Sequence, residues 1–323
     1  MKALVFLEHH EGSLTRAALG VLGKAARLGG EAAGVVAGSG VRSLAEEAGR
    51  FGAALVHVAD DERLAAALPQ PRVDVLAGLV REEGYDTVLF AQSVLAGDVA
   101  AALAARLGAG LNWDLVDLAE RDGALVGTRR ALADSVVVEA GWASEPRLAL
   151  FRAGAFDPVE EENGGPAEVR DLDVALEEHS TLAELVEEAR PAETEGVPLE
   201  EAEVIVAAGR GLGSPERFGL VEELADALGG AVATTRAVVD AGWYPYPTQV
   251  GQTGKTVAPK LYVAVGISGA IQHKVGMQGA RVVVAINKDP HAPIFEYSDL
   301  AVVGDLHTIV PRLTELVRAR RGA

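Results

Sequence analysis

Glycines and hydrogen-bonding residues follow each of five short apolar runs in the C-terminal part of the chain. Two of these runs, Leu261–Val265 and residues 282–286, are too short for independent helices and rich in β-branched residues, which predicts strands buried on both faces. The segments after the five runs are residues 209–214, 234–236, 268–273, 287 and 304–305. Parallel strands end at one edge of their sheet, and open α/β sheets bind ligands there. We therefore expect a ligand site at this edge.

These segments contain the groups that bind a nucleotide-like ligand. Arg210 and Arg236 supply guanidinium groups and the glycines free backbone N–H groups, both of which match phosphate oxygens. Asp305 offers a carboxylate that could accept hydrogen bonds from ribose or adenine. Hydroxyl groups, the amide of Asn287 and the imidazole of His273 complete the set. The combination predicts a large ligand with a pyrophosphate, a ribose and a heterocycle.

Each of these side chains also has a structural explanation. A lone buried histidine such as His273 is more often structural than functional. Arg210 and Arg236 could form surface ion pairs, which contribute little to stability. The hydroxyls of Thr253 and Ser268 could simply cap the helices that follow them.

Two phosphate-binding motifs fail on close reading. Gly209, Gly211 and Ser214 miss the G-x-G-x-x-G fingerprint because the third position is serine. Residues 254–256, GKT, resemble the end of a P-loop, but its first glycine would fall at Gln249 and no strand directly precedes it. Neither the usual dinucleotide scheme nor Walker chemistry is therefore expected.

Composition excludes several further classes of function. The chain of 323 residues has 29 basic and 47 acidic side chains and a formal net charge of −18, which argues against binding nucleic acid or an anionic membrane surface. The absence of cysteine excludes disulfides, thiolate zinc sites, iron–sulfur clusters and cysteine nucleophiles. His9 and His10 would point to opposite faces of a strand, so no metal site is expected. The sequence has no G-x-S-x-G motif, so a catalytic serine on a nucleophile elbow is not expected.

The apolar content also bears on size and location. Hydrophobic residues make up 49% of the chain, which is ample for large cores. The first residues read as a strand rather than a signal peptide. No run approaches the ~18 apolar residues of a membrane-spanning helix. We expect a soluble, cytoplasmic protein with no transmembrane segment.

The first part of the chain alternates strands and helices. The predicted strands are residues 2–7, 31–37, 54–58 and 87–91, and the predicted helices are residues 13–28 with Ser13 as N-cap, 41–50, 60–68, 73–83 and 97–107. This rhythm predicts a parallel sheet with helices on both faces. Residues 127–140 and 148–152 are predicted as antiparallel strands, the first a hairpin. The result is a Rossmann-like domain, of the adenine nucleotide α-hydrolase-like type, with added antiparallel strands.

An acidic stretch separates this part from a second βα region. Residues 156–200 are rich in glutamate and aspartate, with a short helix predicted over residues 181–189. We predict an N-terminal domain over residues 1–190, a linker over 191–202 and a C-terminal domain over 203–323. The acidic, proline-containing linker is read as a solvated tether, with a docking surface as the alternative.

The second domain is predicted to be doubly wound around a parallel sheet. Its predicted strands are residues 204–208, 231–233, 261–265, 282–286 and 300–303, and its predicted helices are residues 215–228 and 306–320.

Several motifs of the second domain resemble those of electron transfer flavoprotein α subunits. The run LYVAVGISGAIQH at residues 261–273, with Gly276 and the AIN at 285–287, resembles the family signature, and QVGQTGK at 249–255 with AP at 258–259 resembles its flavin loop. Other matching segments are GRGL at 209–212, RA at 236–237, DAG at 240–242, NKDP at 287–290 and APIF at 292–295. The resemblance covers residues 203–317 densely and the first domain more loosely.

The resemblance implies an electron carrier rather than an enzyme with its own substrate. Family members form a heterodimer in which the α chain holds one FAD and the β subunit usually carries AMP. They shuttle electrons from flavin dehydrogenases of the acyl-CoA dehydrogenase type, which serve fatty acid β-oxidation, to a quinone oxidoreductase or another acceptor. The second domain would then be the FAD-binding domain.

Motif positions imply which residues contact FAD. They are Arg210, Thr235, Arg236, Gln249, Val250, Gly251, Gln252, Thr253, Ser268, Gly269, Ala270, Ile271, Gln272, His273, Asn287, Asp305 and Leu306. Among them, Arg236 would lie against the isoalloxazine and stabilise the reduced, anionic flavin. Thr253 would hydrogen-bond near the N5/O4 edge, and His273 would lie near O2. Thr235 replaces the family's usual serine and keeps the hydroxyl.

Several alternatives remain open at the level of sequence. The aromatic residues of the segment 243–248, WYPYPT, could shape flavin exposure, although packing of the turn is favoured. A different class of function is an NAD-dependent enzyme on the related deoxyhypusine-synthase-like fold, which would need Lys255 or His273 as a catalytic residue. A cofactor-free scaffold is a third reading, disfavoured by the polar residues at the strand ends. An exposed apolar patch on the second domain would favour the carrier, because a partner must cover it. Simple carriage and electron bifurcation are not distinguished.

Overall fold

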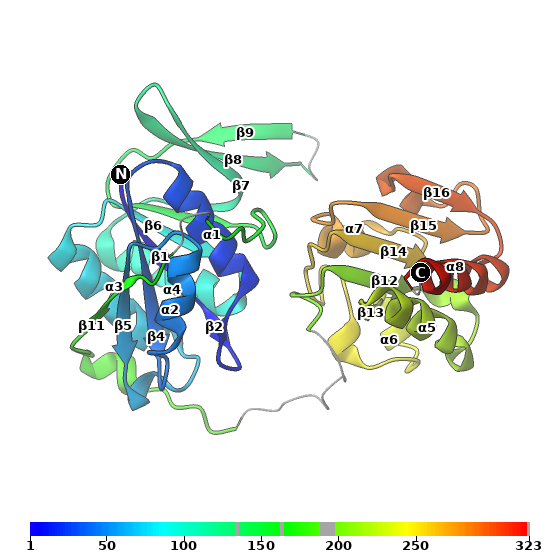
Figure 1. Ribbon diagram of the computed structural model, residues 1–323, viewed down its shortest axis with the longest axis horizontal. Helices are drawn as coiled ribbons and strands as arrows, with labels where there is room; N and C mark the ends of the chain where they lie inside the picture. Colours follow the sequence, from blue (N-terminus) through cyan, green and yellow to red (C-terminus); the bar gives the residue numbers. More distant parts are fainter. Residues whose placement is uncertain (133–135, 162–164, 188–197, 322–323) are drawn as a thin grey trace. The chain divides into compact units, whose positions relative to one another are not determined.

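The computed structural model describes residues 1–132, 136–161, 165–187 and 198–321. The chain divides into two compact units, Met1–Glu188 and Ala189–Ala323 (Figure 1). The predicted linker falls mostly outside the described residues. Its described end packs onto the second unit, where Leu199 and Ala202 are buried in a hydrophobic cluster.

The first unit contains a nine-stranded sheet with the order β11-β5-β4-β1-β6-β10-β7-β8-β9 (Figure 1). Its strands are β1 (Lys2–Phe6), β4 (Glu31–Gly38), β5 (Leu55–Asp60), β6 (Thr87–Ala91), β7 (Leu111–Arg121), β8 (Ala124–Ala131), β9 (Val136–Ala140), β10 (Arg147–Phe151) and β11 (Glu168–Asp171). The strands from β11 to β7 pair in parallel, and β8 pairs antiparallel with both β7 and β9. The predicted parallel sheet with added antiparallel strands is therefore confirmed.

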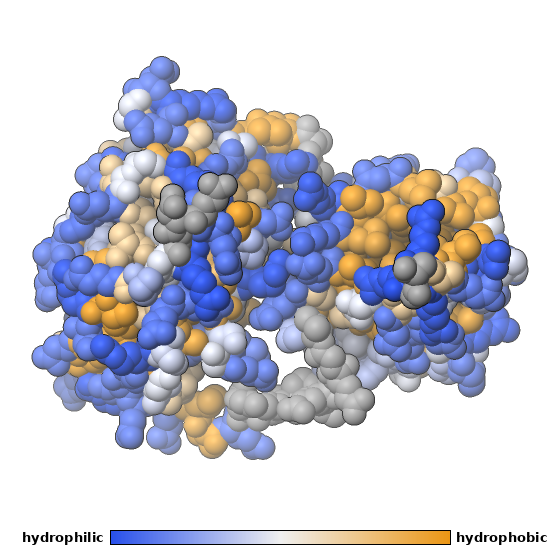
Figure 2. All heavy atoms as spheres, in the orientation of Figure 1, coloured by the Kyte–Doolittle hydropathy of each residue, from blue (hydrophilic) through white to orange (hydrophobic). Residues whose placement is uncertain are grey.

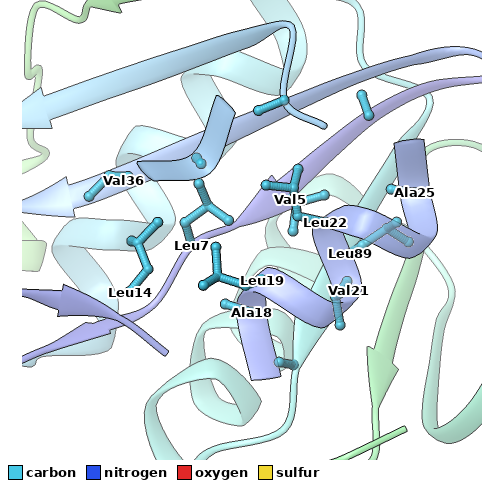
Figure 3. Packing of buried hydrophobic residues seen from close by; sticks show 14 of the residues in the cluster. Val5, Leu7, Leu14, Ala18, Leu19, Val21, Leu22, Ala25, Val36 and Leu89 are labelled. Carbon is cyan, nitrogen blue, oxygen red and sulfur yellow. The ribbon is translucent and has the colours of Figure 1, made fainter. Parts of the chain in front are cut away.

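Helices cover both faces of this sheet because its central strands are apolar on both sides. The helices are α1 (Arg16–Arg27), α2 (Leu44–Arg50), α3 (Pro69–Glu83) and α4 (Val94–Leu107). Val5 and Leu7 pack with α1 and α2 in one cluster (Figure 3), whereas Leu4 and Phe6 pack with α3 and α4 in another. Within β1, Val5 thus packs against one helical layer and its neighbours Leu4 and Phe6 against the other, which is the packing of a doubly wound sheet.

One predicted strand of the first unit was given the wrong direction, and two strands were missed. Residues 148–152 were predicted as an antiparallel strand, but β10 lies between β6 and β7 and runs parallel to both. Strand β7 was missed because its apolar residues do not alternate regularly. The strand shifts register near Leu115, and Asp114 adopts a positive φ of 59°. Strand β11 was missed within the acidic stretch, where it pairs in parallel with β5.

Three predicted helical features were also wrong. Thr15, not Ser13, caps α1, because its side chain accepts a hydrogen bond from Ala18 N. Ser13 instead belongs to β3 (Ser13–Leu14), which pairs with β2 (His9–His10). Residues 60–68 form only the 3-10 turn Glu62–Leu64, since Leu68 is extended before the proline that starts α3. Within the predicted helix 181–189, the described residues 182–187 form none, and residues 188–189 lie outside the described range.

The second unit is a five-stranded, fully parallel sheet with the order β13-β12-β14-β15-β16 (Figure 1). The strands are β12 (Val204–Ala208), β13 (Ala231–Thr234), β14 (Leu261–Val265), β15 (Val283–Asn287) and β16 (Leu300–Val303), and the helices are α5 (Gly219–Leu228), α6 (Arg236–Val239), α7 (Ile271–Met277) and α8 (Leu306–Arg321). The chain turns from β13 back past β12 to β14, so the strand order reverses between β12 and β14. Ligands of doubly wound folds bind at such a switch point.

Both faces of the second sheet are covered as well. Val206 and Val263 pack with α5 and α8 in one cluster, and Ile205 and Tyr262 pack with α7 in another. The predicted doubly wound parallel sheet is confirmed. Among the residues that the structure describes, none of the helices is long and apolar enough to cross a membrane.

Candidate functional site

Two glycine-rich loops meet by their backbones at the switch point. Gly209 N donates to Val265 O at 2.9 Å, and Gly211 N donates to Gly266 O at 3.0 Å. A Cβ atom on Gly211 would lie 2.6 Å from Gly266 O, and Gly266 itself has a φ of +62°. The glycines after β12 are thus required for contact with the loop after β14, and together the two loops form the base of the site.

Residues 249–255, here called the 249–255 loop, are fixed against β13 and α7. Val250 N donates to Thr234 O at 2.9 Å, and Gln252 N donates to Gln272 O at 2.7 Å. A Cβ atom on Gly276 would overlap the backbone nitrogen of Gly251. The loop therefore lies backbone to backbone on the helix.

Thr253 is held at the exposed turn of the 249–255 loop. Its carbonyl oxygen accepts from Gln249 Nε2 at 3.0 Å and from the Tyr246 hydroxyl at 2.9 Å. Its side-chain Oγ1 accepts from the same Gln249 nitrogen at 3.1 Å. Because the hydroxyl oxygen already accepts a hydrogen bond, its own proton can be donated to a ligand.

His273 lies buried at the start of α7, with 6% of its surface exposed. Its Nδ1 lies 3.0 Å from Val250 O and its Nε2 lies 3.0 Å from the hydroxyl of Tyr262. Burial lowers the pKa of His273 to about 4, although the hydrogen bond to Val250 acts in the opposite direction. The imidazole is therefore neutral near pH 7, and both ring nitrogens are engaged within the protein.

Two arginines supply positive charge at this edge of the sheet. Arg210 follows β12 and is exposed, while Arg236 begins α6 and pairs with Asp240 at 3.2 Å. The side chains of that pair are 66% and 62% exposed. Because exposed pairs contribute little, Arg236 can exchange Asp240 for an anionic ligand at small cost.

Other predicted site residues hold the neighbouring loops in place. Asn287 Nδ2 donates to Ile267 O at 2.9 Å, and its Oδ1 accepts from Asp289 N at 3.0 Å. Asp305 Oδ1 accepts from His307 N at 3.0 Å and so caps α8. These side chains have a structural role at the edge, and each keeps further hydrogen-bonding capacity for a ligand.

The predicted contact residues differ in what they can present to a ligand. The exposed ones are Arg210, Arg236, Gln252, Thr253, Ser268, Ala270, Ile271, Gln272 and Asp305; Thr235 and Asn287 are half-buried; and Gln249, Val250, Gly251, Gly269, His273 and Leu306 are buried. The structure brings the residues after β12, β13 and β14 to one end of the sheet. The buried members can act only through backbone groups or by positioning others.

Sequence reasoning missed the role of Tyr262 and did not assign one to Tyr246. Tyr262 is fully buried in an apolar strand, and the need of its hydroxyl for a partner was the available signal. In the segment 243–248, Trp243 packs against the cluster on α5, and Tyr244 stacks on Phe218 at 4.5 Å. Tyr246 is 62% exposed and hydrogen-bonds to Thr253. Two of the three aromatics therefore pack the turn, and the third supports the 249–255 loop.

Lys255 and the first histidines do not form the alternative sites considered above. Lys255 Nζ pairs with Glu200 Oε2 at 2.8 Å, beside the described end of the predicted linker. His9 Nε2 lies 3.4 Å from Ala37 O, whereas His10 is exposed beside Glu11. Within the described ranges, no group of three or more histidine, aspartate or glutamate side chains could hold a metal ion.

Comparison with known proteins places both units in one family. Residues 3–177 match the family model of the electron transfer flavoprotein domain, and residues 198–278 match that of the electron transfer flavoprotein FAD-binding domain. A protein of Mycobacterium leprae (strain TN) is 42% identical over 324 residues, covering 99% of both chains. A relative from Bacillus subtilis (strain 168) is 39% identical, over 88% of this chain and 87% of the relative. A relative from Thermoanaerobacterium thermosaccharolyticum is 36% identical, over 97% of both chains. All three are named electron transfer flavoprotein subunit alpha.

Proposed function

Because this chain belongs to the electron transfer flavoprotein α-subunit family, we propose that it holds one FAD and carries electrons as a heterodimer with a β subunit. The observation that carries the proposal is the group of exposed polar residues at the switch point of the second unit. The matched FAD-binding domain covers most of that edge. Bound FAD would supply the redox chemistry, since it can accept and release electrons singly or in pairs.

The donors on this edge fit the parts of FAD. The guanidinium of Arg210 and the backbone of the glycine loops suit the pyrophosphate. Asp305 keeps one carboxylate oxygen for a ribose or adenine donor, since the other accepts from His307 N. The Thr253 hydroxyl can donate a hydrogen bond to the N5/O4 edge of the isoalloxazine. We take this agreement of donor types with FAD as support for the site.

Arg236 is the proposed source of positive charge beside the flavin ring. A fixed cation stabilises the extra negative charge of the reduced ring. His273 is proposed to lie near O2, but as a neutral group, because its Nδ1 proton is engaged by Val250 and burial lowers its pKa to about 4. Its part would be to hold the 249–255 loop rather than to supply charge.

The partners follow from the same proposal. The chain, which we propose to be cytoplasmic, would receive electrons from flavin dehydrogenases of the acyl-CoA dehydrogenase type, in fatty acid β-oxidation. It would pass them to a quinone oxidoreductase or another acceptor. Its β subunit would carry AMP. Exposed apolar side chains on the second unit, Leu300 and Val303 at 55% and Leu316 at 50%, offer surface for a partner to cover. Figure 2 shows apolar atoms gathered on this unit around the C-terminal helix.

The alternative, an NAD-dependent enzyme, is not favoured by the comparisons or by the site. It would need Lys255 or His273 as a catalytic group. Lys255 is paired with Glu200, and both nitrogens of the His273 ring are engaged. We therefore propose an electron carrier without a small-molecule substrate of its own.

A visible spectrum followed by anaerobic reductive titration tests this function. The chain should be purified together with a co-expressed β subunit. We expect flavin absorption bands corresponding to about one FAD per α chain, which bleach on reduction and return on reoxidation. A colourless heterodimer that instead binds NAD would reject the proposal and favour the alternative.

A further inference from the structure

Two buried hydrogen bonds connect strand β14 to the 249–255 loop through one side chain. Tyr262 on β14 is 0% exposed, and its hydroxyl lies 3.0 Å from His273 Nε2. The opposite ring nitrogen, Nδ1, lies 3.0 Å from Val250 O. The imidazole thus bridges the core of the sheet and the first turn of the loop.

The chemistry of the three groups fixes the direction of both bonds. A carbonyl oxygen can only accept, so the proton of the neutral His273 ring must be on Nδ1. Nε2 is then the acceptor, and the Tyr262 hydroxyl must donate to it. Burial raises the pKa of Tyr262, which keeps the phenol protonated as this arrangement requires.

The bridge acts on the part of the loop that faces the ligand edge. Val250 starts the turn that carries Gln252 and Thr253, both exposed. His273 fixes the Val250 carbonyl, and the preceding residue, Gln272, accepts from Gln252 N at 2.7 Å. Two consecutive residues of α7 therefore hold the loop at two points, and the orientation of one imidazole sets the first of them.

We propose that Tyr262 is a positioning residue of the cofactor site. Its hydroxyl holds His273 in the Nδ1–H form, and His273 in turn holds the Val250 carbonyl and the exposed turn that follows. Tyr262 touches no ligand itself. The inference rests on the proposed function, because it assigns Tyr262 to the binding of FAD.

The first unit contains a matched pair that serves as a control. His57 Nε2 lies 2.7 Å from the Tyr85 hydroxyl, and both residues are buried. Here the second ring nitrogen, Nδ1, has no hydrogen-bond partner within the described structure, so this pair does not bridge to a loop. Tyr85→Phe removes the same hydroxyl from the same kind of pair without touching the second unit.

The first experiment reads the histidine directly and needs no FAD. Nitrogen NMR of the full chain labelled at histidine separates the two ring forms, and His273→Asn identifies the His273 signals. We expect the Nδ1–H form in the wild type, with an Nε2 signal that shifts in Tyr262→Phe and stays unchanged in Tyr85→Phe. An Nε2–H form in the wild type, or no shift in Tyr262→Phe, would overturn the proposal. The wild-type reading decides the ring form even if a variant folds poorly.

The second experiment measures FAD binding by the heterodimer. We expect Tyr262→Phe to raise the Kd for FAD about tenfold, which corresponds to about 1.4 kcal/mol, with little change in Tyr85→Phe. Equal Kd values in the two variants would overturn the role of Tyr262 and leave the proposed function intact. A wild-type heterodimer that binds no FAD would overturn the proposed function, and with it this role, whatever the NMR signals show.

Discussion

The polar side chains of the site fall into two groups according to what they already bind. Asn287, Gln249 and His273 are engaged by neighbouring backbone or side-chain groups, so they shape the site. Thr253 keeps a free hydroxyl proton, and Arg236 has only an exposed ion pair to give up. We therefore expect substitutions in the first group to weaken ligand binding by altering the shape of the site. Substitutions in the second group should change the redox potential of the proposed flavin.

Arg236→Ala tests the charge at the ring. Since the pair with Asp240 is exposed, its loss should change the free energy of unfolding by about 1 kcal/mol or less. The midpoint potential of the bound flavin should fall, because the negative charge added by reduction is no longer stabilised by a nearby cation. The free energy of reduction should become less favourable by about 1 kcal/mol per electron or more. Potentiometry of the heterodimer measures this. Arg312→Ala, which removes another exposed ion pair, should leave the potential unchanged; equal potentials in all three proteins would show that Arg236 does not face the ring.

The buried His273 also makes stability depend on pH. Its pKa is about 4 in the folded chain and near 6.5 when unfolded, so only the unfolded state takes up this proton as the pH falls below 6.5. Neutral His273 therefore contributes fully to the free energy of unfolding above pH 6.5. About 2 kcal/mol of this free energy should be lost between pH 6.5 and 5.

Urea unfolding of the second unit at pH 7.5 and pH 5 measures this loss. His273→Asn should be less stable than the wild type at pH 7.5 but should lose less on acidification. Parallel losses in both proteins would assign the pH dependence to other groups.

At the level of residues, the sequence predicted which groups would gather at the edge but not how they bond. The positions of these side chains follow from the parallel arrangement of the strands, since the carboxyl ends of all strands in such a sheet lie at the same edge. Their hydrogen-bond partners cannot be predicted in this way, because they depend on side-chain directions in the packed core. Tyr262 reaches His273 across 11 positions of the chain, and nothing in the spacing of the two residues indicates that contact.

Among the elements, helix α7 and the 249–255 loop form a close backbone-to-backbone junction. Gly276 is the point of contact, because a Cβ atom there would overlap Gly251 N. Gly276→Ala should therefore destabilise the second unit and weaken FAD binding, although alanine normally favours a helix.

Gly78→Ala, in the middle of α3, provides the control for this substitution. An added Cβ at Gly78 meets nothing within 4 Å, so this variant should gain about 0.5–1 kcal/mol of stability. Thermal unfolding and FAD titration of both variants measure the contrast. A stabilised Gly276→Ala with normal FAD binding would mean that the loop and the helix can separate freely.

The elements themselves show where sequence patterns suffice. Strands such as β1, β6 and β14 were predicted because each is a short apolar run between polar or glycine residues. The failures have local causes that tertiary contacts decide. Strand β10 pairs with β6 and β7, far from it in sequence, so its direction could not be read from its own residues. Strand β11 is polar and mostly exposed at the sheet edge, so it carries no apolar signal.

On the scale of the whole molecule, the described hydrophobic clusters are each confined to one unit. Leu22 lies in a cluster of the first unit and Ile205 in a cluster of the second, and both are 0% exposed. Leu22→Ala and Ile205→Ala should each cost about 2–5 kcal/mol, but in different unfolding transitions.

Calorimetry can resolve the two transitions. The flavin signal then assigns them, because the proposed flavin belongs to the second unit. If either substitution lowered both transitions equally, the two units would have to unfold as one cooperative structure.

A fragment that encodes the second unit alone must begin before the buried Leu199 and Ala202 and the ion-paired Glu200. The predicted domain boundary at Glu203 would omit two buried side chains and the carboxylate that pairs with Lys255. A fragment that starts at Pro198 would retain all three. We expect only the longer fragment to be expressed as folded, yellow protein, and the shorter one to be degraded or to aggregate during expression.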